Sequence, residues 1–274
     1  MNKKVFLTGA AGFAGKPIAE YLHQRKFKVT KILFSHFKKR GIKIDLTKKI
    51  LLERDFDWIV HTASHHKIKD FKSKPKLKEK NNILMVKNLI KFSKKNKIKN
   101  FIYFSTIDLN YSPYPLIKQR YCQSKLLCEK ILLAALRKKI FKKLIILRIP
   151  SIVKKNSGEN FIINTLYKLK NDLPLTIWNA ESKYNNLIHI NDLSKLVFYL
   201  IKNTTKDKKI IINCLSSKPI ILKKLVNYVV KKLNSKSEIN FINKKNNFKI
   251  KKTNFFSRTN YKFFEVKKVI DLLI

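Results

Sequence analysis

The sequence predicts an α/β fold, in which a doubly wound parallel sheet is joined to a smaller C-terminal α/β lobe. Over the first 150 residues, short apolar runs of strand type alternate with segments of helical periodicity. These runs are apolar throughout, which is typical of parallel strands covered on both faces. Beyond Pro150 the alternation becomes irregular, which predicts a division into residues 1–150 and 151–274.

Each strand is expected where a run of β-branched and aromatic residues is bounded by charged or turn residues. The first, KKVFLTG, ends at a glycine. Further strands are expected at 28–34, 41–46, 57–64, 99–106 and 142–150, with short ones at 175–178 and 186–190. A strand and a helix near 186–213 are expected to return to the first part, so that the two parts are interleaved.

Helices are expected where apolar residues recur every three or four positions. These segments are 13–27, 51–56, 74–96, 120–139, 192–203, 220–233 and 265–274. Asp192 precedes an apolar helical run and is expected to be its N-cap. His189 is expected in the strand before it.

The charge of the chain is extreme: 62 Lys and Arg residues stand against 17 Asp and Glu, a formal +45. A protein that binds nucleic acid is one interpretation. However, only seven of the basic residues are arginines, and the lysines are spread along the whole chain. We therefore attribute the charge to lysine-rich composition and expect no specific nucleic-acid partner, only weak, salt-dependent attraction to polyanions.

Cysteine usage and hydropathy predict a protein of the cytoplasm. Cys122, Cys128 and Cys214 are an odd number without CxxC spacing, which is typical of reduced thiols. No apolar run approaches the roughly 18 residues of a membrane span, so no membrane partner is expected. The N-terminus leads directly into a strand, and we expect no signal peptide.

Glycine is concentrated at one place. The chain has five glycines, and Gly9, Gly12 and Gly15 lie within the segment TGAAGFAG, after the first strand and at the start of the first helix. There, Gly9 allows a tight turn, Gly12 lets a pyrophosphate approach the backbone, and Gly15 lets the helix pack close to the sheet. This context predicts a dinucleotide-binding site at the helix N-terminus.

A Tyr and a Lys one helical turn apart form a second motif. Tyr121 and Lys125, in RYCQSK, share one face of the helix expected at 120–139. A neighbouring ammonium is expected to lower the pKa of the phenol and prepare it for proton transfer. Tyr114 and Lys118 have the same spacing, but Tyr114 lies between two prolines, so we prefer Tyr121.

With GxxGxxG, YxxSK and Glu129 four residues after Lys125, the chain resembles the extended short-chain dehydrogenase/reductase family of nucleotide-sugar epimerases, dehydratases and reductases. FIYFSTIDLNY and LRIPSIV resemble further segments of that family. The resemblance implies a Rossmann-like domain over 1–150 and a substrate lobe over 151–274. It assigns the catalytic roles to Thr106, Tyr121 and Lys125.

The resemblance also implies the binding residues. Cofactor contacts are expected from Gly9, Gly12, Phe13, Gly15, Asp45, Ala63, Ser64, Tyr121, Lys125 and Pro150. Substrate contacts are expected from Thr106 and Ser151. Asn82 matches a helix-positioning residue of the family. The expected cofactor is NAD or NADP, the expected substrate is a sugar or nucleotide sugar, and a homodimer is a candidate assembly.

Departures from the family pattern concern the ligands. The second strand ends without an Asp or Glu for a ribose hydroxyl, and Ser35, Lys38, Lys39 and Arg40 favour NADP slightly. Asn185 stands where the family often has an arginine that grips the substrate diphosphate, and the YGPG motif after the sixth strand is missing. These losses place the nucleotide part of the substrate in question.

Two alternatives remain open from sequence. His61, His65 and His66 suggest metal binding, but a zinc site needs further ligands, so we expect no metal. The chain could also be a non-catalytic NADP-binding sensor or an RNA-binding protein. Retention of the Tyr, Lys and Thr favours an NAD(P)-dependent epimerase, dehydratase or reductase.

Overall fold

The structure is a computed structural model that describes residues 3–34, 41–65, 74–111, 114, 118–155, 157–158, 160–203, 206–243, 259 and 261–274. Its centre is a parallel sheet with the strand order β11-β6-β5-β4-β1-β2-β3. The bounds are β1 Lys4–Thr8, β2 Lys28–Leu33, β3 Ile42–Lys43, β4 Trp58–His61, β5 Asn100–Thr106, β6 Lys143–Ile149 and β11 Lys209–Asn213. The order reverses between β1 and β4, which is where doubly wound sheets bind ligands.

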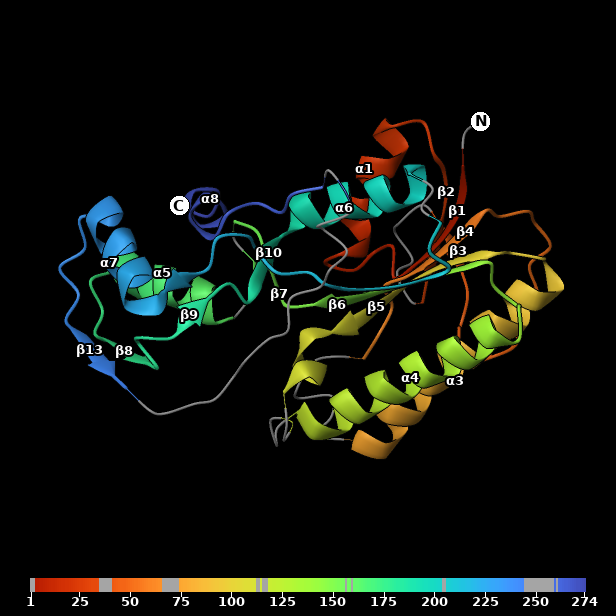
Figure 1. The fold of residues 1–274 in the computed structure, drawn as a ribbon, viewed down its shortest axis with the longest axis horizontal. Helices are drawn as coiled ribbons and strands as arrows, with labels where there is room; N and C mark the ends of the chain where they lie inside the picture. The colour runs from red at the N-terminus through yellow and green to blue at the C-terminus, as the bar shows by residue number, and fades with distance from the viewer. Residues whose placement is uncertain are drawn as a thin grey trace.

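Helices cover both faces of this sheet (Figure 1). On one face lie α1, Gly15–Gln24, and α6, Ile190–Lys202; on the other lie α3, Pro75–Lys95, and α4, Gln119–Arg137. Strand side chains alternate between the two cores. Val5 and Leu7 of β1 belong to the core under α1 and α6, and Phe6 belongs to the core under α3 and α4. The sheet is therefore buried on both faces, as its continuous apolar strands predict.

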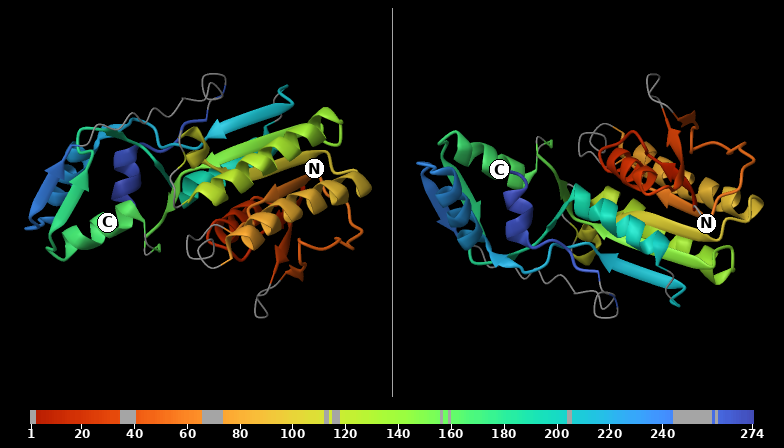
Figure 2. Two further views of the ribbon diagram at one scale, coloured as in Figure 1. Left: turned by 90° about the horizontal axis from the view of Figure 1, so that it is seen from below. Right: turned by 90° about the horizontal axis from the view of Figure 1, so that it is seen from above.

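A smaller part lies at the end of the molecule away from β2 and β3 (Figure 2). It holds three helices, α5 Phe161–Lys170, α7 Leu222–Leu233 and α8 Val266–Asp271. Its strands pair two by two: β7 Ser151–Val153 with β10 Leu187–His189, β8 Leu175–Trp178 with β13 Ile239–Ile242, and β9 Lys183–Tyr184 with β12 Ile220–Ile221. A separate core joins the three helices.

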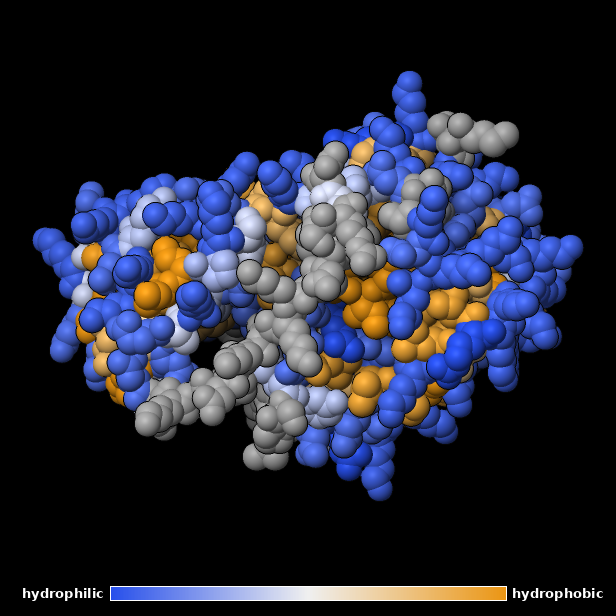
Figure 3. Space-filling model, in the orientation of Figure 1, coloured by the Kyte–Doolittle hydropathy of each residue, from blue (hydrophilic) through white to orange (hydrophobic). Residues whose placement is uncertain are grey.

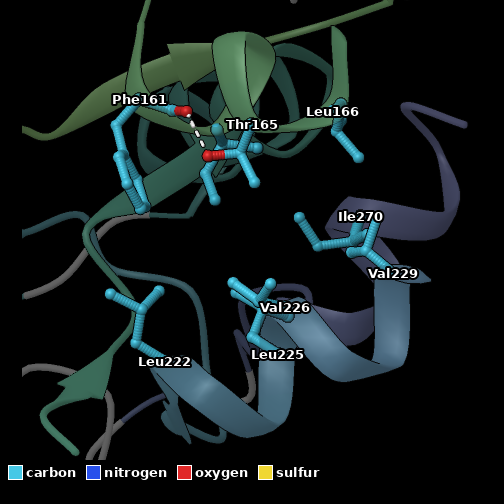
Figure 4. Close-up of a pocket in the computed structure, with 9 residues that line it drawn as sticks. Phe161, Thr165, Leu166, Leu222, Leu225, Val226, Val229 and Ile270 are labelled. Atoms are coloured by element: carbon cyan, nitrogen blue, oxygen red, sulfur yellow. Dashed lines mark hydrogen bonds between the residues drawn. The ribbon is translucent and has the colours of Figure 1, made fainter. Parts of the chain in front are cut away.

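The facing surfaces of α5, α7 and α8 leave a small apolar pocket (Figure 4). Leu225, Val226 and Val229 of α7 point toward α5 and toward Ile270 of α8. The one polar side chain among the lining residues, Thr165, donates its hydroxyl hydrogen to the Phe161 carbonyl at 2.9 Å. Because the Thr165 hydroxyl is hydrogen-bonded within its own helix, it presents no free polar group to the pocket. The pocket is therefore part of the apolar core of the smaller part.

The chain returns from the smaller part to the sheet between β10 and β12. Here α6 packs against α1, and β11 adds a parallel strand beside β6. The buried Asp192 carboxylate of α6 accepts hydrogen bonds from the Tyr261 hydroxyl and the Phe264 N–H, both at 2.7 Å. These bonds hold the C-terminal segment against α6.

Two expected features of local structure are wrong. Residues 51–56 form no helix. Phe56 is instead buried, with its ring 5.2 Å from that of Phe6, whereas residues 51, 53, 54 and 55 are exposed, so the segment has no buried face to stabilise a helix. Asp192 is not the N-cap of α6, because the helix begins earlier: His189 is the cap, and its Nδ1 accepts the Asn191 N–H at 3.2 Å.

Hydrophilic side chains cover the visible face of the molecule from one end to the other, between scattered apolar patches (Figure 3). Among the described residues, no helix is both long enough and apolar enough to cross a membrane.

Leu225→Ala should lower the free energy of unfolding by about 2–4 kcal/mol, because a fully buried leucine leaves a cavity when truncated. Urea unfolding followed by circular dichroism measures this loss. Lys224→Ala, an exposed neighbour on the same helix, should change stability by no more than about 0.5 kcal/mol. Equal losses in the two variants would contradict the packing described here.

Candidate active site

The carboxyl ends of four neighbouring strands meet at one edge of the sheet. Thr8 of β1 is in register with His61 of β4, and His61 with Tyr103 of β5. Further along β5, Thr106 is in register with Ile149 of β6. The residues that follow these strands therefore lie side by side, although they come from distant parts of the sequence.

The turn after β1 can be made only by glycine. Gly9 has φ +66°, and a Cβ there would lie 2.7 Å from Thr62 Oγ1 and 2.8 Å from the Ala63 nitrogen. A Cβ on Gly15 would overlap the Gly9 carbonyl oxygen. The turn is thus pressed against the residues that follow β4, and Ala63 lies directly beside it.

Gly12 and Phe13 form the exposed part of the same turn. A Cβ on Gly12 would lie only 3.1 Å from the Gly9 carbonyl oxygen, so the backbone is drawn in tightly there. The helix that follows, α1, has neither a side-chain cap at Ala14 nor an acidic residue in its first turn. An exposed glycine at an uncapped helix N-terminus is a suitable place for an anionic group such as a pyrophosphate.

Behind the turn, His61 is held neutral. Its Nδ1 lies 2.7 Å from Thr8 Oγ1, and its ring stacks on Tyr103 with centroids 5.8 Å apart. Burial, with a smaller contribution from the Lys125 charge, lowers the pKa of His61 to about 3. The neutral ring fills the space between β1 and β5.

Tyr121 and Lys125 lie on one face of α4, with the ammonium Nζ 5.7 Å from the centre of the phenol ring. Lys125 is only 3% exposed, and its Nζ donates to the Phe104 carbonyl at 2.8 Å. Burial lowers the pKa of Lys125 to about 8. In contrast, Tyr114 lies outside any helix. The structure therefore brings the preferred Tyr–Lys pair to the ends of the strands.

The electrostatic setting of Tyr121 differs from the expected one. Burial is the largest influence and raises the pKa of the phenol, and the nearby Asp108 carboxylate raises it further. A side-chain hydrogen bond with Thr106 acts in the opposite direction. Desolvation and a carboxylate that the sequence had not drawn attention to therefore act against the lowering that was expected from Lys125.

Asp108 and Lys118 are the residues that sequence reasoning missed. Thr106 Oγ1 donates to Asp108 Oδ2 at 3.0 Å, and Lys118 Nζ lies 3.0 Å from the same oxygen. Asp108 belongs to a short 3-10 helix, η1 Ile107–Asn110, for which Thr106 is the N-cap. Two signals in the sequence could have indicated them. Asp108 is an acidic residue two positions after Thr106, and Lys118 is the lysine of the YxxxK pair that was rejected.

A second network fixes α4 against the sheet. The Glu129 carboxylate accepts Ser105 Oγ at 2.5 Å, and Arg148 Nε and Nη2 at 3.1 and 2.8 Å. Arg148 Nη1 also donates to Asn110 Oδ1 at 3.0 Å. The guanidinium thus joins the end of β6 to both α4 and η1, and it neutralises a buried carboxylate.

Asn82 of α3 fastens the loop after β4 to α4. Its Oδ1 accepts the His65 N–H at 2.9 Å and the Ser64 hydroxyl at 3.4 Å. Its Nδ2 donates to Ser124 Oγ at 3.3 Å, three residues after Tyr121 on the chain. This arrangement gives Asn82 the positioning contacts that the resemblance implied.

The remaining predicted residues are more scattered. Asp45 follows the edge strand β3, where its Oδ1 accepts the Thr47 N–H at 2.9 Å. Pro150 is buried and Ser151 is exposed, directly beyond the strand position that pairs with Thr106. The residues favouring NADP, and one histidine of the metal interpretation, lie outside the described residues: Ser35, Lys38, Lys39, Arg40 and His66.

Known proteins resemble the chain in sequence. Residues 5–214 match the sequence profile of the NAD dependent epimerase/dehydratase family. The dTDP-D-glucose 4,6-dehydratase of Dictyostelium discoideum is 32% identical over 127 residues, which cover 38% of this chain. The chain spans 29% of the length of that relative.

Solved structures resemble the whole fold. WbmH of Bordetella bronchiseptica, in complex with NAD+, is similar with a TM-score of 0.77 at 18% identity; 100% of this chain and 97% of that one are covered. The UDP-N-acetylglucosamine 4-epimerase of Methanobrevibacter ruminantium, in complex with UDP-N-acetylmuramic acid, also has a TM-score of 0.77, at 21% identity, with 99% and 96% covered. These similarities confirm the predicted Rossmann-like α/β fold.

His61 predicts a loss of stability in mild acid. Because its pKa falls from 6.5 to about 3 in the fold, the unfolded chain takes up a proton first as the pH drops. The contribution of His61 to the free energy of unfolding is fully present above pH 6.5 and is lost as the pH falls toward 3. About 2 kcal/mol of this contribution is lost between pH 7 and pH 5. Urea unfolding at both pH values should show this loss in the native chain and a smaller one in His61→Gln.

The exposed His23 of α1 provides the control for this measurement. His23→Gln should retain the native pH dependence. A loss of equal size in His61→Gln and the native chain would assign the acid sensitivity to other groups.

Proposed function

Because the chain belongs to the NAD dependent epimerase/dehydratase family, we propose that it is an enzyme that oxidises or reduces a sugar carbon with NAD(P), the sugar being nucleotide-linked. The observation that carries this proposal is the meeting of Thr106, Tyr121 and Lys125 at the edge of the sheet that also holds the Gly9 turn. A protein that only binds the cofactor has no need of this hydroxyl, phenol and ammonium.

The residues present fit a dinucleotide. The turn of Gly9, Gly12, Phe13 and Gly15 would receive the pyrophosphate at the uncapped start of α1. The other contacts would come from Asp45 toward the adenine, Ala63 and Ser64 along the middle, and Lys125 and Pro150 toward the nicotinamide end. When bound, the cofactor supplies or accepts the hydride.

The protein's own part is proton transfer and positioning. Tyr121 would give its phenolic proton to a sugar keto oxygen, or take one from a sugar hydroxyl. Lys125 stabilises the phenolate form by its charge, and its bond to the Phe104 carbonyl fixes the ammonium in place. Thr106 would orient the reacting oxygen beside the phenol, and Ser151 would contact the substrate from β7.

Two observations bear on the substrate. The relatives include a dehydratase named for dTDP-D-glucose and an epimerase solved with UDP-N-acetylmuramic acid, which supports a nucleoside-diphosphate sugar. Asn185, at the position of the family's diphosphate-binding arginine, uses its amide to donate to the Ser216 carbonyl at 3.2 Å. We infer that cationic side chains at positions other than 185 hold the diphosphate.

For the cofactor we propose that NADP is accepted as well as NAD. The segment that follows β2, residues 34–40, contains no acid to bond a ribose 2′-hydroxyl and repel a 2′-phosphate. The cytoplasmic location and the homodimer both stay predictions.

A thermal-shift screen tests ligand class, because ligands that bind only the folded state raise the melting temperature. We expect NAD or NADP to raise it, and a nucleotide sugar to raise it further in the presence of the cofactor. Stabilisation by RNA alone at moderate salt would contradict the enzyme assignment.

Tyr121→Phe tests the catalytic assignment. Turnover should fall by about 100-fold or more, because the proton donor is lost, while the dissociation constant for the cofactor stays within about twofold. Tyr167→Phe, at an exposed tyrosine of α5, is the matched control and should retain full turnover. Full turnover in Tyr121→Phe would exclude the proposed role.

A further inference from the structure

The glycine turn after β1 can receive a pyrophosphate but carries no charged side chain of its own. Its residues, in the segment TGAAGFAG, are all neutral. The next lysine along the chain, Lys16, has its Nζ 3.8 Å from the Glu20 carboxylate, one turn further along α1. The start of a helix supplies only about half a positive charge, which is less than the negative charge of a pyrophosphate. A further cation at the turn would therefore strengthen binding.

A lysine of the smaller part lies over this turn. The Lys154 Nζ is 5.2 Å from the centre of the Phe13 ring. Phe13 belongs to the turn, is 40% exposed, and directly follows the exposed Gly12. The ammonium of Lys154 is thus beside the residues of the turn that a ligand would meet first.

The path of the backbone brings Lys154 to this place. Lys154 directly follows β7, which runs between the central sheet and the helices of the smaller part (Figure 1). Ile152 of β7 packs against the core under α1 and α6, and so do Ala11 and Ala14 of the turn. The strand therefore passes close to the start of α1, and the position of Lys154 does not depend on the reach of its side chain alone.

The backbone of Lys154 is fastened on both sides. Val153, immediately before it, is fully buried in the core of the smaller part. After it the chain turns back: the Ser157 N–H donates to the Lys154 carbonyl at 3.1 Å, and the Lys154 N–H donates to Ser157 Oγ at 3.4 Å. A side chain that starts from an ordered backbone loses less conformational freedom when it binds an anion.

The charge of Lys154 is not used elsewhere in the part of the chain that the structure describes. Within those residues Lys154 forms no ion pair, whereas Lys16 and Lys118 each have a carboxylate partner. A cation over a partly exposed ring is held only weakly. A phosphate oxygen forms a stronger, charge-assisted bond with an ammonium, so such a ligand can draw Lys154 away from Phe13.

We propose that Lys154 is a cofactor-binding residue whose ammonium bonds the pyrophosphate of the dinucleotide at the glycine turn. The identity of this ligand rests on the proposed function. The backbone at Gly12 and the start of α1 would supply N–H donors, and Lys154 would supply the full positive charge. Because Lys154 belongs to the smaller part, a bound cofactor would also link that part to the central sheet.

A nucleotide sugar carries the same diphosphate group and is the second possible source of such a ligand. We assign Lys154 to the cofactor because the ring beneath its ammonium belongs to the turn itself. In contrast, position 185, where the family often has its diphosphate-binding arginine, lies beyond β9 in the smaller part. The experiment has one arm for each source.

The first arm measures the dissociation constants of NAD, ADP and adenosine by calorimetric titration of the full chain at low salt. Lys154→Gln should weaken NAD and ADP about 10-fold, because one charge-assisted hydrogen bond is lost. It should leave adenosine, which has no phosphate, within about twofold. Equal weakening of all three ligands would indicate a general disturbance of the site and would overturn the proposal.

Lys155→Gln is the matched control. Lys155 is the next residue along the chain and is exposed, and its Nζ donates to the Ile274 carbonyl at 2.9 Å. Its substitution removes the same charge, but should leave the NAD dissociation constant within about twofold. An equal effect of the two substitutions would reduce the role of Lys154 to the overall positive charge of the protein. Lys154→Arg, which keeps a cation that bonds phosphate, should retain tight NAD binding.

The second arm titrates UDP into the chain saturated with NAD. The proposal requires native UDP affinity in Lys154→Gln. A loss of UDP affinity with unchanged NAD affinity would assign Lys154 to the substrate and overturn the proposal.

The outcome can be separated from that of the proposed function. If Lys154→Gln weakens NAD but the native chain turns over no sugar, the inference stands and the proposed function fails. If the native chain turns over a nucleotide sugar but Lys154→Gln binds NAD as tightly as the native chain, the inference alone fails. A native chain that binds neither NAD nor ADP would contradict both.

Discussion

The contact between the Gly9 turn and the backbone after β4 is the constraint on which the rest of the site depends. With a Cβ only 2.7–2.8 Å from its neighbours, any other residue at position 9 would push the two strand ends apart. The same turn starts α1, and the residues that follow β4 are bonded through Asn82 to the helix that carries Tyr121. The Gly9 turn and the helix that carries Tyr121 are thereby linked through one set of contacts.

Within that frame, buried charges determine how the site is tuned. Lys125 and Glu129 lie on the same helix, one turn apart, and their charges are satisfied differently. Glu129 has a bidentate guanidinium partner, whereas Lys125 donates to the neutral Phe104 carbonyl. The Glu129 carboxylate is therefore largely neutralised, which leaves Asp108 as the acid that acts on Tyr121.

The sequence predicted those parts of the site that rest on local spacing. The glycines after β1 and the i, i+4 pair on α4 depend on turn and helix geometry alone, and both were placed correctly. Asp108–Lys118 and Glu129–Arg148 join residues 10 and 19 positions apart across different elements, and no local pattern specifies such pairs. Which of two YxxxK pairs lies on a helix could be decided, because proline flanks Tyr114.

The same distinction holds for the fold. Continuous apolar strands identified the central sheet, but the smaller part consists of short paired strands whose partners lie up to about 60 residues away. The false helix at 51–56 shows the limit of periodicity in a six-residue window: Leu51 is exposed, and Phe56 alone of the segment is buried. The N-cap of α6 was expected at Asp192 and lies at His189. A histidine ring nitrogen can accept a hydrogen bond from a backbone N–H, as an aspartate carboxylate does.

The return of α6 and β11 to the central sheet has a consequence for how the protein is made. Until residue 213 has left the ribosome, β6 remains an open edge, and until residue 202 has, α1 lacks the neighbouring helix α6. The nascent chain therefore exposes the surfaces of an unfinished sheet while the segments of the other part are translated. Chaperones would be needed mainly during this interval, and a translational pause before β11 would prolong the exposure.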